Sequence, residues 1–395
     1  MAAARKRSET TRKRAVRRDN GAESGSRVAL VLQGGGALGA YHIGAYQALQ
    51  EAGYEPDWVS GISIGAINAA ILVGNRPEER LARLDQLWEE ISWPNEWGAM
   101  LDGPFRMAFN EMSAAGAMLF GQPNFWRPRF PNPALIPQLE PEAASYCDTS
   151  PMRATLQRLA NFDLINSREV RISLGATRLS TGDLEFFDNR TQTIEVDHVL
   201  ASGSLPPGFP ATRIGDELYW DGGCVSNTPL NAIYADDHRG HTLVFMIDLW
   251  GASGAPPTSM DQVGWRQKQI QYASRTSQVI ASLATQHNLR RALKASGKSL
   301  PKPAPEDAAV TTATAMESDQ TLDIVHVIYH PTSDQISESD AEFSRPSIAA
   351  RRAAGYEDLK HALAKAPWTA RRGAPHEGTI VHRVEGGKVT SLACH

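Results

Sequence analysis

The chain has 395 residues, of which 42% are hydrophobic and 21% are charged, and it contains three cysteines. This length accommodates one large domain with an appendage, or two domains, and the apolar fraction excludes a wholly disordered chain. No sequence run approaches the roughly 18 apolar residues of a membrane-spanning helix. The cysteines form no CxxC pair, which excludes a disulfide framework, disfavours a zinc site and favours a reducing compartment.

Charge is distributed unevenly along the sequence. Residues 1–18 carry eight Lys and Arg against one Glu, a net charge of +7. Because the whole chain has a net charge of −4, the remaining residues together carry −11. We expect residues 1–26 to be a solvated, disordered basic tail, with binding to anionic lipid or nucleic acid as the alternative. The segment lacks the apolar core of a secretory signal. The expected location is cytoplasmic, with peripheral contact at a membrane left open.

Two strand–turn–helix units begin the ordered part of the chain. Residues 28–32 are a continuous apolar run typical of a strand covered on both faces, and residues 37–52 have helical spacing. A second short strand over 58–60 leads into a small-residue helix over 66–73. This alternation predicts a three-layer α/β fold with a largely parallel sheet and helices on both faces. Further strands are predicted at 170–176, 184–187, 218–220, 243–249 and 324–329, helices at 260–295 and 346–366, and a hairpin at 379–392.

Two stretches interrupt this pattern. Residues 93–130 hold eight aromatic residues and four Met, and Pro and Gly occur throughout, so one regular helix is not expected there. Such a composition suits an adaptable lid or acyl pocket, and packing as core against the sheet is the alternative. Residues 297–320 are rich in Pro, Ala and Thr and are predicted to be a linker or loop.

The strongest chemical signal is Gly61-Ile62-Ser63-Ile64-Gly65, a GxSxG between a predicted strand and helix. A sharp turn there lifts the serine hydroxyl clear of the backbone, and Gly61 and Gly65 let strand and helix approach closely. The helix N-terminus adds partial positive charge that favours an anionic intermediate. Ser63 is therefore the candidate nucleophile.

A second signal is the glycine-rich loop Gly34-Gly35-Gly36-Ala37-Leu38-Gly39. It matches the GxGxxG of dinucleotide-binding folds, which also require an acidic residue about 20 positions later, at the far end of the second strand. Asp57 has that offset but precedes the strand. The competing interpretation is an oxyanion hole, in which glycine N–H groups point at a developing alkoxide. A purely structural turn is a third possibility.

A third signal is Asp221-Gly222-Gly223, directly after the predicted strand at 218–220. Most such triplets are turns. Upstream lies the segment 201–210 (ASGSLPPGFP), a rigid apolar loop suited to a pocket wall.

Taken together, these blocks resemble the patatin-like phospholipases. The order is a GGGxxG loop, GxSxG about 27 residues later, then AS…P…FP and DGG, and the resemblance runs from about Val28 to Pro229. Many members of that family carry Arg or Lys where Leu38 stands, which puts a preference for anionic headgroups in doubt. The resemblance implies a Ser–Asp dyad, with Ser63 as nucleophile, Asp221 as general base and the glycine N–H groups at 34–36 as oxyanion hole.

An ordinary Ser–His–Asp hydrolase is the nearest rival, and its histidine would come from His238, His241, His287 or His330. Ser63 follows only one βα unit, whereas that fold takes an oxyanion donor from a loop after its third strand. Each of these histidines is more simply explained as a surface or structural imidazole. His42 is interpreted as a packing residue, and Cys224 as a buried thiol that fills space.

The expected organisation is a tail at 1–26, a hydrolase domain at 27–332 and a C-terminal extension at 333–395. The expected activity is cleavage of carboxylic esters of lipids through a Ser63 acyl-enzyme, with neither cofactor nor metal. Partners are then a lipid substrate and a membrane or droplet surface, with no specific nucleic acid and the oligomeric state open. The alternatives are an esterase, thioesterase or storage-polyester depolymerase, a dinucleotide-binding module at residues 34–39, or an inactive scaffold targeted by the basic tail.

Overall fold

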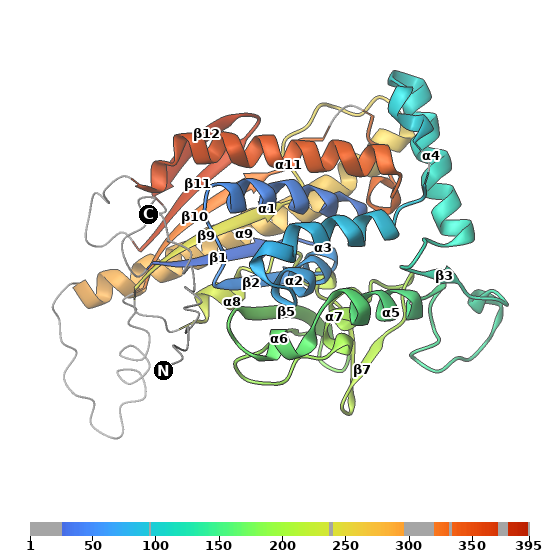
Figure 1. Ribbon diagram of the computed structural model, residues 1–395, viewed down its shortest axis with the longest axis horizontal. Helices are drawn as coiled ribbons and strands as arrows, with labels where there is room; N and C mark the ends of the chain where they lie inside the picture. Colours follow the sequence, from blue (N-terminus) through green and yellow to red (C-terminus); the bar gives the residue numbers. More distant parts are fainter. Residues whose placement is uncertain are drawn as a thin grey trace, which may run out of the picture.

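The computed structural model describes residues 26–94, 96–236, 240–295, 320–331, 334–369 and 378–393. The basic tail and the predicted linker lie outside the described residues, apart from Ser26 and Gln320. A ten-stranded sheet of order β12-β11-β10-β9-β1-β2-β5-β8-β7, with β6 also paired to β5, forms the centre of the described part (Figure 1). Its strands are β1 (Arg27–Leu32), β2 (Trp58–Ile62), β5 (Arg171–Arg178), β6 (Leu184–Asp188), β7 (Thr212–Ile214), β8 (Glu217–Asp221), β9 (His241–Asp248), β10 (Thr321–Ile328), β11 (Thr379–Glu385) and β12 (Lys388–Ala393).

Six neighbouring strands of this sheet, from β11 to β5, run parallel, and antiparallel strands occur only toward its two edges among the described residues. A separate two-stranded sheet pairs β3 (Arg127–Pro128) with β4 (Cys147–Asp148). The helices are α1 (Tyr41–Glu51), α2 (Ile64–Val73), α3 (Pro77–Glu90), α4 (Gly103–Phe120), α5 (Ser150–Leu159), α6 (Phe162–Asn166), α7 (Val196–Ser202), α8 (Asn231–Tyr234), α9 (Met260–Ala295) and α11 (Arg345–Lys365).

Helices cover both faces of the sheet because the central strands are apolar on both sides. Successive side chains of a strand point to opposite faces. In β1, Leu30 and Leu32 belong to the larger core, which α1, α2 and α11 close, whereas Ala29 and Val31 belong to the core beneath α8 and α9. All four are at most 1% exposed. The predicted three-layer α/β fold with a largely parallel sheet is thus confirmed.

The C-terminal part is continuous with the rest of the fold. Strand β11 pairs parallel to β10 in the main sheet, and β12 returns antiparallel beside it. Helix α11 lies directly on α1, as Figure 1 shows. Two glycines permit this close approach: a Cβ on Gly44 would lie 1.9 Å from Arg352 O, and one on Gly355 would lie 2.1 Å from Tyr41 O. The segment expected as an extension therefore supplies both strands and a covering helix.

The predicted strands and helices are found, with small shifts of their bounds. Residues 260–295 form one helix, and the predicted helix at 37–52 is split into a 3₁₀ turn at Gly36–Ala40 followed by α1. The aromatic-rich stretch is not one regular helix, as expected: a 3₁₀ turn at Trp97–Met100, α4 with its 18 residues, and β3 follow one another there. Gly103 and Pro104 of α4 stand at the first helical positions, where they do not interrupt the hydrogen bonds, and Gly116 is tolerated within the helix. None of the described helices has the length and apolarity needed to cross a membrane.

Candidate active site

The three predicted motifs meet at one edge of the sheet. Strands β1 and β2 are parallel neighbours with Leu32 opposite Gly61, so the glycine loop and Ser63 both follow the carboxyl ends of their strands. Ligands of open parallel sheets bind at this edge. Asp221 reaches it from the other direction: it ends β8, opposite Ala176 of β5, while Gly175 is opposite Ile62 of β2. Strand register therefore places Ser63 and Asp221 at the same edge of the sheet, with only β5 between their strands.

Ser63 lies in a strained turn between β2 and α2. Its backbone has φ 56° and ψ −128°, a conformation that a non-glycine residue adopts at a cost of about 1–3 kcal/mol. The turn is tight because both flanking glycines touch backbone: a Cβ on Gly61 would lie 2.4 Å from Gly65 O, and one on Gly65 would lie 2.2 Å from Leu32 O. The Ser63 N–H donates to Ser202 O at 2.9 Å. The side chain is half-buried, so its hydroxyl remains accessible.

Asp221 is 1% exposed, and its two carboxyl oxygens are in different situations. Oδ1 accepts a hydrogen bond from the Gly223 N–H at 2.7 Å, whereas Oδ2 has no hydrogen-bond partner in the described part of the chain. Burial raises the pKa of this carboxyl from its ordinary value of 3.8 to about 7, opposed by the Gly223 N–H and by the nearby Ser63 side chain. The backbone N–H of Asp221 donates to Ser204 O at 3.0 Å.

The predicted oxyanion glycines differ in the availability of their N–H groups. The Gly34 N–H donates to Asn227 O at 3.2 Å and is therefore occupied. The N–H groups of Gly35 and Gly36 donate to no group among the described residues. The Gly34 carbonyl accepts from Asn227 Nδ2 at 2.7 Å and from Trp250 Nε1 at 3.0 Å, which fixes the loop. Gly35 and Gly36 are thus the two glycines with donors available.

The glycine loop is closely covered by the protein itself. A Cβ on Gly34 would lie 2.3 Å from Asn227 Oδ1 and 2.9 Å from Ser63 Cβ, and one on Gly36, at φ +55°, would lie 2.1 Å from Asp340 O. This packing leaves little room for a pyrophosphate along the loop. Asp57, the residue with the dinucleotide offset, accepts a hydrogen bond from the Val28 N–H at 2.9 Å, at the far end of the strands.

Three of the four histidines that a Ser–His–Asp triad could draw on are engaged elsewhere. His241 begins β9, at the sheet edge opposite Ser63, and its Nε2 is 2.8 Å from Asp323 Oδ2. His287 contacts Thr379 at the start of β11, at that same opposite edge. His330 follows β10, three strands from β2, with its Nε2 3.1 Å from Glu385 Oε1. His238 lies outside the described residues.

His42 is packed within the helical layer as expected. It is 1% exposed, its Nδ1 is 3.1 Å from Asn68 Nδ2, and burial lowers the pKa of its imidazole to about 3. The prediction for Cys224 was wrong: its thiol is exposed. Leu38 is fully buried in the core and has no contact with solvent.

Two supporting residues were missed from the sequence, Ser202 and Asn227. Ser202 accepts from the Ser63 N–H and donates through Oγ to Gly175 O at 2.6 Å, so it joins the turn to β5. Asn227 donates to the glycine loop, and its Oδ1 lies so close to Gly223 that a Cβ there would be 3.0 Å away. Both stand within blocks already singled out, at 201–210 and just after Asp-Gly-Gly. Their amide and hydroxyl side chains were the available signal.

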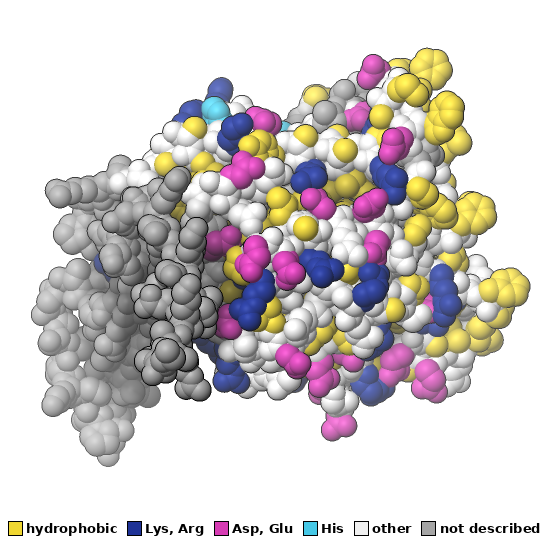
Figure 2. Space-filling model, in the orientation of Figure 1, with side chains coloured by type: hydrophobic (Ala, Val, Ile, Leu, Met, Phe, Trp, Pro, Cys, Tyr) yellow, Lys and Arg dark blue, Asp and Glu magenta, His cyan; other side chains and the backbone are white. Residues whose placement is uncertain are grey.

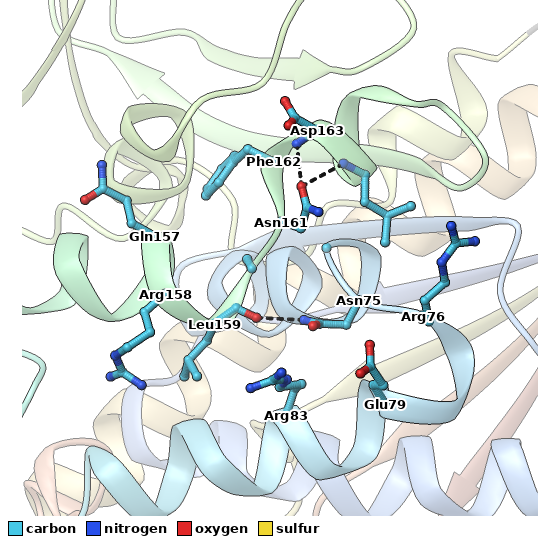
Figure 3. Close-up of a pocket in the computed structure, with 13 residues that line it drawn as sticks. Asn75, Arg76, Glu79, Arg83, Gln157, Arg158, Leu159, Asn161, Phe162 and Asp163 are labelled. Atoms are coloured by element: carbon cyan, nitrogen blue, oxygen red, sulfur yellow. Dashed lines mark hydrogen bonds between the residues drawn. The ribbon is translucent and has the colours of Figure 1, made fainter.

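A polar hollow of about 620 Å³ lies away from this site (Figure 3). It is bordered by the end of α2 and by α3, α5 and α6, and its lining includes Asn75, Arg76, Glu79, Arg83 and Arg158. Neither Ser63 nor Asp221 contributes to it. The hollow therefore belongs to the helical layer and not to the serine turn.

Fold and site define the chain as a three-layer α/β protein with a strained serine turn beside a buried aspartate. Residues 30–234 match the sequence model of the patatin-like phospholipase family, and residues 270–374 match a second one, described as patatin phospholipase. The chain belongs to the patatin-like phospholipase family, whose members are lipid ester hydrolases.

Individual relatives cover smaller shares. Neuropathy target esterase sws of Drosophila melanogaster and that of Drosophila sechellia are each 42% identical over 67 residues, which is 17% of this chain and 5% of theirs. Among solved structures, VipD from Legionella pneumophila aligns over 86% of this chain and 67% of its own, with 16% identity and a TM-score of 0.35. Human GIVD cytosolic phospholipase A2 aligns over 56% of this chain and 43% of its own, with 13% identity and a TM-score of 0.29.

Proposed function

We propose that the chain cleaves carboxylic esters of lipids through a Ser63–Asp221 dyad. The observation that carries this proposal is the pairing of an accessible serine in a strained turn with a buried carboxyl that has one unpartnered oxygen. A carboxylate at its ordinary pKa is a weak base for a hydroxyl. Burial of Asp221, which raises its pKa to about 7, makes it a stronger base near neutral pH.

The first half of the reaction forms an acyl-enzyme. Asp221 Oδ2 accepts the Ser63 hydroxyl proton as Oγ bonds to the ester carbonyl carbon, and the carbonyl oxygen becomes an oxyanion. The free N–H groups of Gly35 and Gly36 stabilise that charge; removal of one such donor typically costs about 10²–10³ in rate. The tetrahedral intermediate then collapses, the ester C–O bond breaks, and the leaving alcohol takes the proton from Asp221.

The second half reverses these roles with water. Asp221 accepts a proton from the attacking water as its oxygen bonds to the acyl carbon. Collapse of the second intermediate returns the proton to Ser63 Oγ and releases the carboxylic acid. Because Asp221 must be ionised at the start of each half, the rate should rise with pH through a pKa near 7.

Hydrolysis of medium-chain p-nitrophenyl esters by the full chain tests the dyad. Wild type should release p-nitrophenol, whereas Ser63→Ala and Asp221→Asn should each lower the rate at least about a thousandfold. His330→Ala is the matched control and should retain full activity. Activity that survives Asp221→Asn but is lost with a histidine substitution would establish a triad instead.

A substrate panel addresses the acyl compound. Phospholipids, neutral glycerides, acyl thioesters and a storage polyester are offered to wild type and Ser63→Ala, and the acid released is quantified. We expect Ser63-dependent release from lipid esters. Turnover confined to thioesters or polyester would replace the lipid assignment by the corresponding esterase class.

A further inference from the structure

Helix α4 is amphipathic in the reverse sense to an ordinary surface helix. Its buried side includes Arg106 and Asn110, at 8% and 3% exposure. Its outward side carries Phe105, Met112 and Leu119, which are 70–76% exposed. These three positions are seven residues apart and therefore lie on one stripe of the helix. Of the 18 residues of α4, only Arg106 and Glu111 are charged, and Arg106 points inward.

Polar contacts, together with the buried Ala114 and Ala117, hold this helix on the protein while Phe105, Met112 and Leu119 remain exposed. The Arg106 guanidinium donates to Ser347 Oγ at 2.9 Å, to Asn110 Oδ1 at 3.1 Å and to Gly98 O, and it lies 3.7 Å from Asp334 Oδ2. Asn110 Nδ2 donates to Asp334 O at 3.1 Å. Hydrogen bonds to a charged group contribute more than neutral ones. The outward apolar stripe is consequently not needed to hold α4 on the protein.

Neighbouring segments extend this stripe into one apolar edge. We define the apolar edge as the exposed side chains Met100, Phe105, Met112, Leu119, Phe120 and Phe130, which are 70–98% exposed. Figure 2 shows hydrophobic side chains protruding along the side of the molecule where Figure 1 draws α4 and the segment after β3. Exposed apolar side chains gathered along one side of a molecule mark a candidate interaction site.

The apolar edge is connected to the candidate active site through two sets of contacts. On one side, α4 is bonded to residues 334–347, and within that segment Asp340 O packs against Gly36 of the candidate oxyanion loop. On the other, Trp126 Nε1 donates to Ala117 O of α4, and the Trp126 ring packs on Phe209, 5.3 Å between centroids. Phe209 belongs to the apolar loop at 201–210, and Ser204 O of that loop accepts a hydrogen bond from the Asp221 N–H. The apolar edge is therefore joined by direct contacts to the segments that flank the candidate oxyanion loop and Asp221.

We propose that the apolar edge docks the protein onto a lipid surface, an inference that rests on the proposed lipid ester hydrolysis. Continuity with the site favours this occupant, because a lipid substrate is itself part of such a surface. The shape of the edge favours it too. Its side chains project singly from several elements, and fluid acyl chains fill the spaces between them, whereas a second protein would need a matching relief. Apolar side chains inserted at the acyl boundary bind in proportion to the area they bury.

Sedimentation of the full chain with phosphatidylcholine vesicles tests the proposal. Wild type should co-sediment, and the triple variant Phe105→Glu, Met112→Glu and Leu119→Glu should bind at least about a hundredfold more weakly, because charges replace three apolar side chains that would insert into the bilayer. Leu289→Glu, at a position 59% exposed on α9, is the matched control and should bind as wild type. On vesicles containing phosphatidylglycerol the ratio should be at least as large, because the anionic headgroups also repel the added carboxylates.

Enzyme assays separate this inference from the proposed function. The triple variant should hydrolyse soluble p-nitrophenyl butyrate at the wild-type rate and lose vesicle-lipid hydrolysis, while Ser63→Ala should bind vesicles like wild type. Unchanged vesicle binding of the triple variant overturns the docking proposal. If wild type is instead a dimer, and the three substitutions dissociate the dimer without changing vesicle binding, the apolar edge is a dimer interface and the proposal is also overturned. Vesicle binding through α4 without any ester hydrolysis supports docking and overturns the proposed function instead.

Discussion

Replacement of Asp221 by Asn should abolish ester hydrolysis and at the same time stabilise the folded protein above neutral pH. The wild-type carboxyl is buried, with its pKa raised to about 7, so at pH 8 the folded chain contains a buried charge whose Oδ2 has no partner. Asn has nearly the same shape and no charge. Its Oδ1 can still accept the hydrogen bond from the Gly223 N–H.

The magnitude follows from proton linkage. A rise of the Asp221 pKa from 3.8 to about 7 corresponds to roughly 4 kcal/mol in favour of the neutral form. Between these two values the folded state binds more protons than the unfolded state, so this group makes stability fall as pH rises. The cost is absent below pH 3.8 and complete above pH 7. Because buried charges are partly relieved by relaxation and water, we expect Asp221→Asn to gain about 1–4 kcal/mol at pH 8.

Urea unfolding at pH 8 and pH 4 measures this gain. The free energy of unfolding of Asp221→Asn should exceed that of wild type at pH 8 and approach it at pH 4, since the other titrating groups are shared and cancel in the difference. Ser63→Ala retains the carboxylate and should not reproduce this pH-dependent gain. An Asp221→Asn protein that is no more stable than wild type at pH 8 would refute the reasoning.

Three further predictions concern the residues around this carboxyl. Ser63→Gly should be inactive yet more stable than Ser63→Ala by about 1–3 kcal/mol in thermal unfolding, because only glycine relieves the positive φ; equal stability would mean that the turn is unstrained. Gly34→Ala should lose about 1–3 kcal/mol and most activity, since its Cβ would lie 2.3 Å from Asn227 Oδ1; wild-type kinetics would show that the loop can move. Asn227→Ala should lower stability by about 1–2 kcal/mol and kcat by tenfold or more, because the Gly34 carbonyl loses a donor, and an unchanged kcat would limit Asn227 to a structural role.

Local pattern was sufficient to predict the elements that carry the candidate site. The apolar run of β1 and the glycines around Ser63 are signals contained within a few residues, because strand burial and tight turns depend on local side-chain size and polarity. The parallel sheet then places the glycine loop and Ser63 at one edge. These steps needed no knowledge of contacts distant in the sequence.

What the sequence did not reveal depends on such distant contacts. Asn227 bonds to Gly34 across 193 positions, and Asp340 packs on Gly36 from the segment that had been assigned to an extension. The Gly34 N–H is likewise occupied by a distant residue, because it donates to Asn227 O. The reversed polarity of α4 was equally hidden, because composition alone does not tell which side of a helix faces the protein.

Three features that cost stability meet at the sheet edge around Ser63. A positive φ at Ser63, an unpartnered oxygen on Asp221 and available N–H groups at Gly35 and Gly36 each cost free energy that ordinary packing would recover. Neighbouring side chains hold these groups in place, as Asn227 and Trp250 do for the glycine loop. Strained and unsatisfied groups that their neighbours hold together at one place are typical of a site that meets a reacting partner, which supports the proposed roles of Ser63 and Asp221. The tests on Asp221 and Ser63 are therefore informative as a pair, because both are expected to exchange activity for stability.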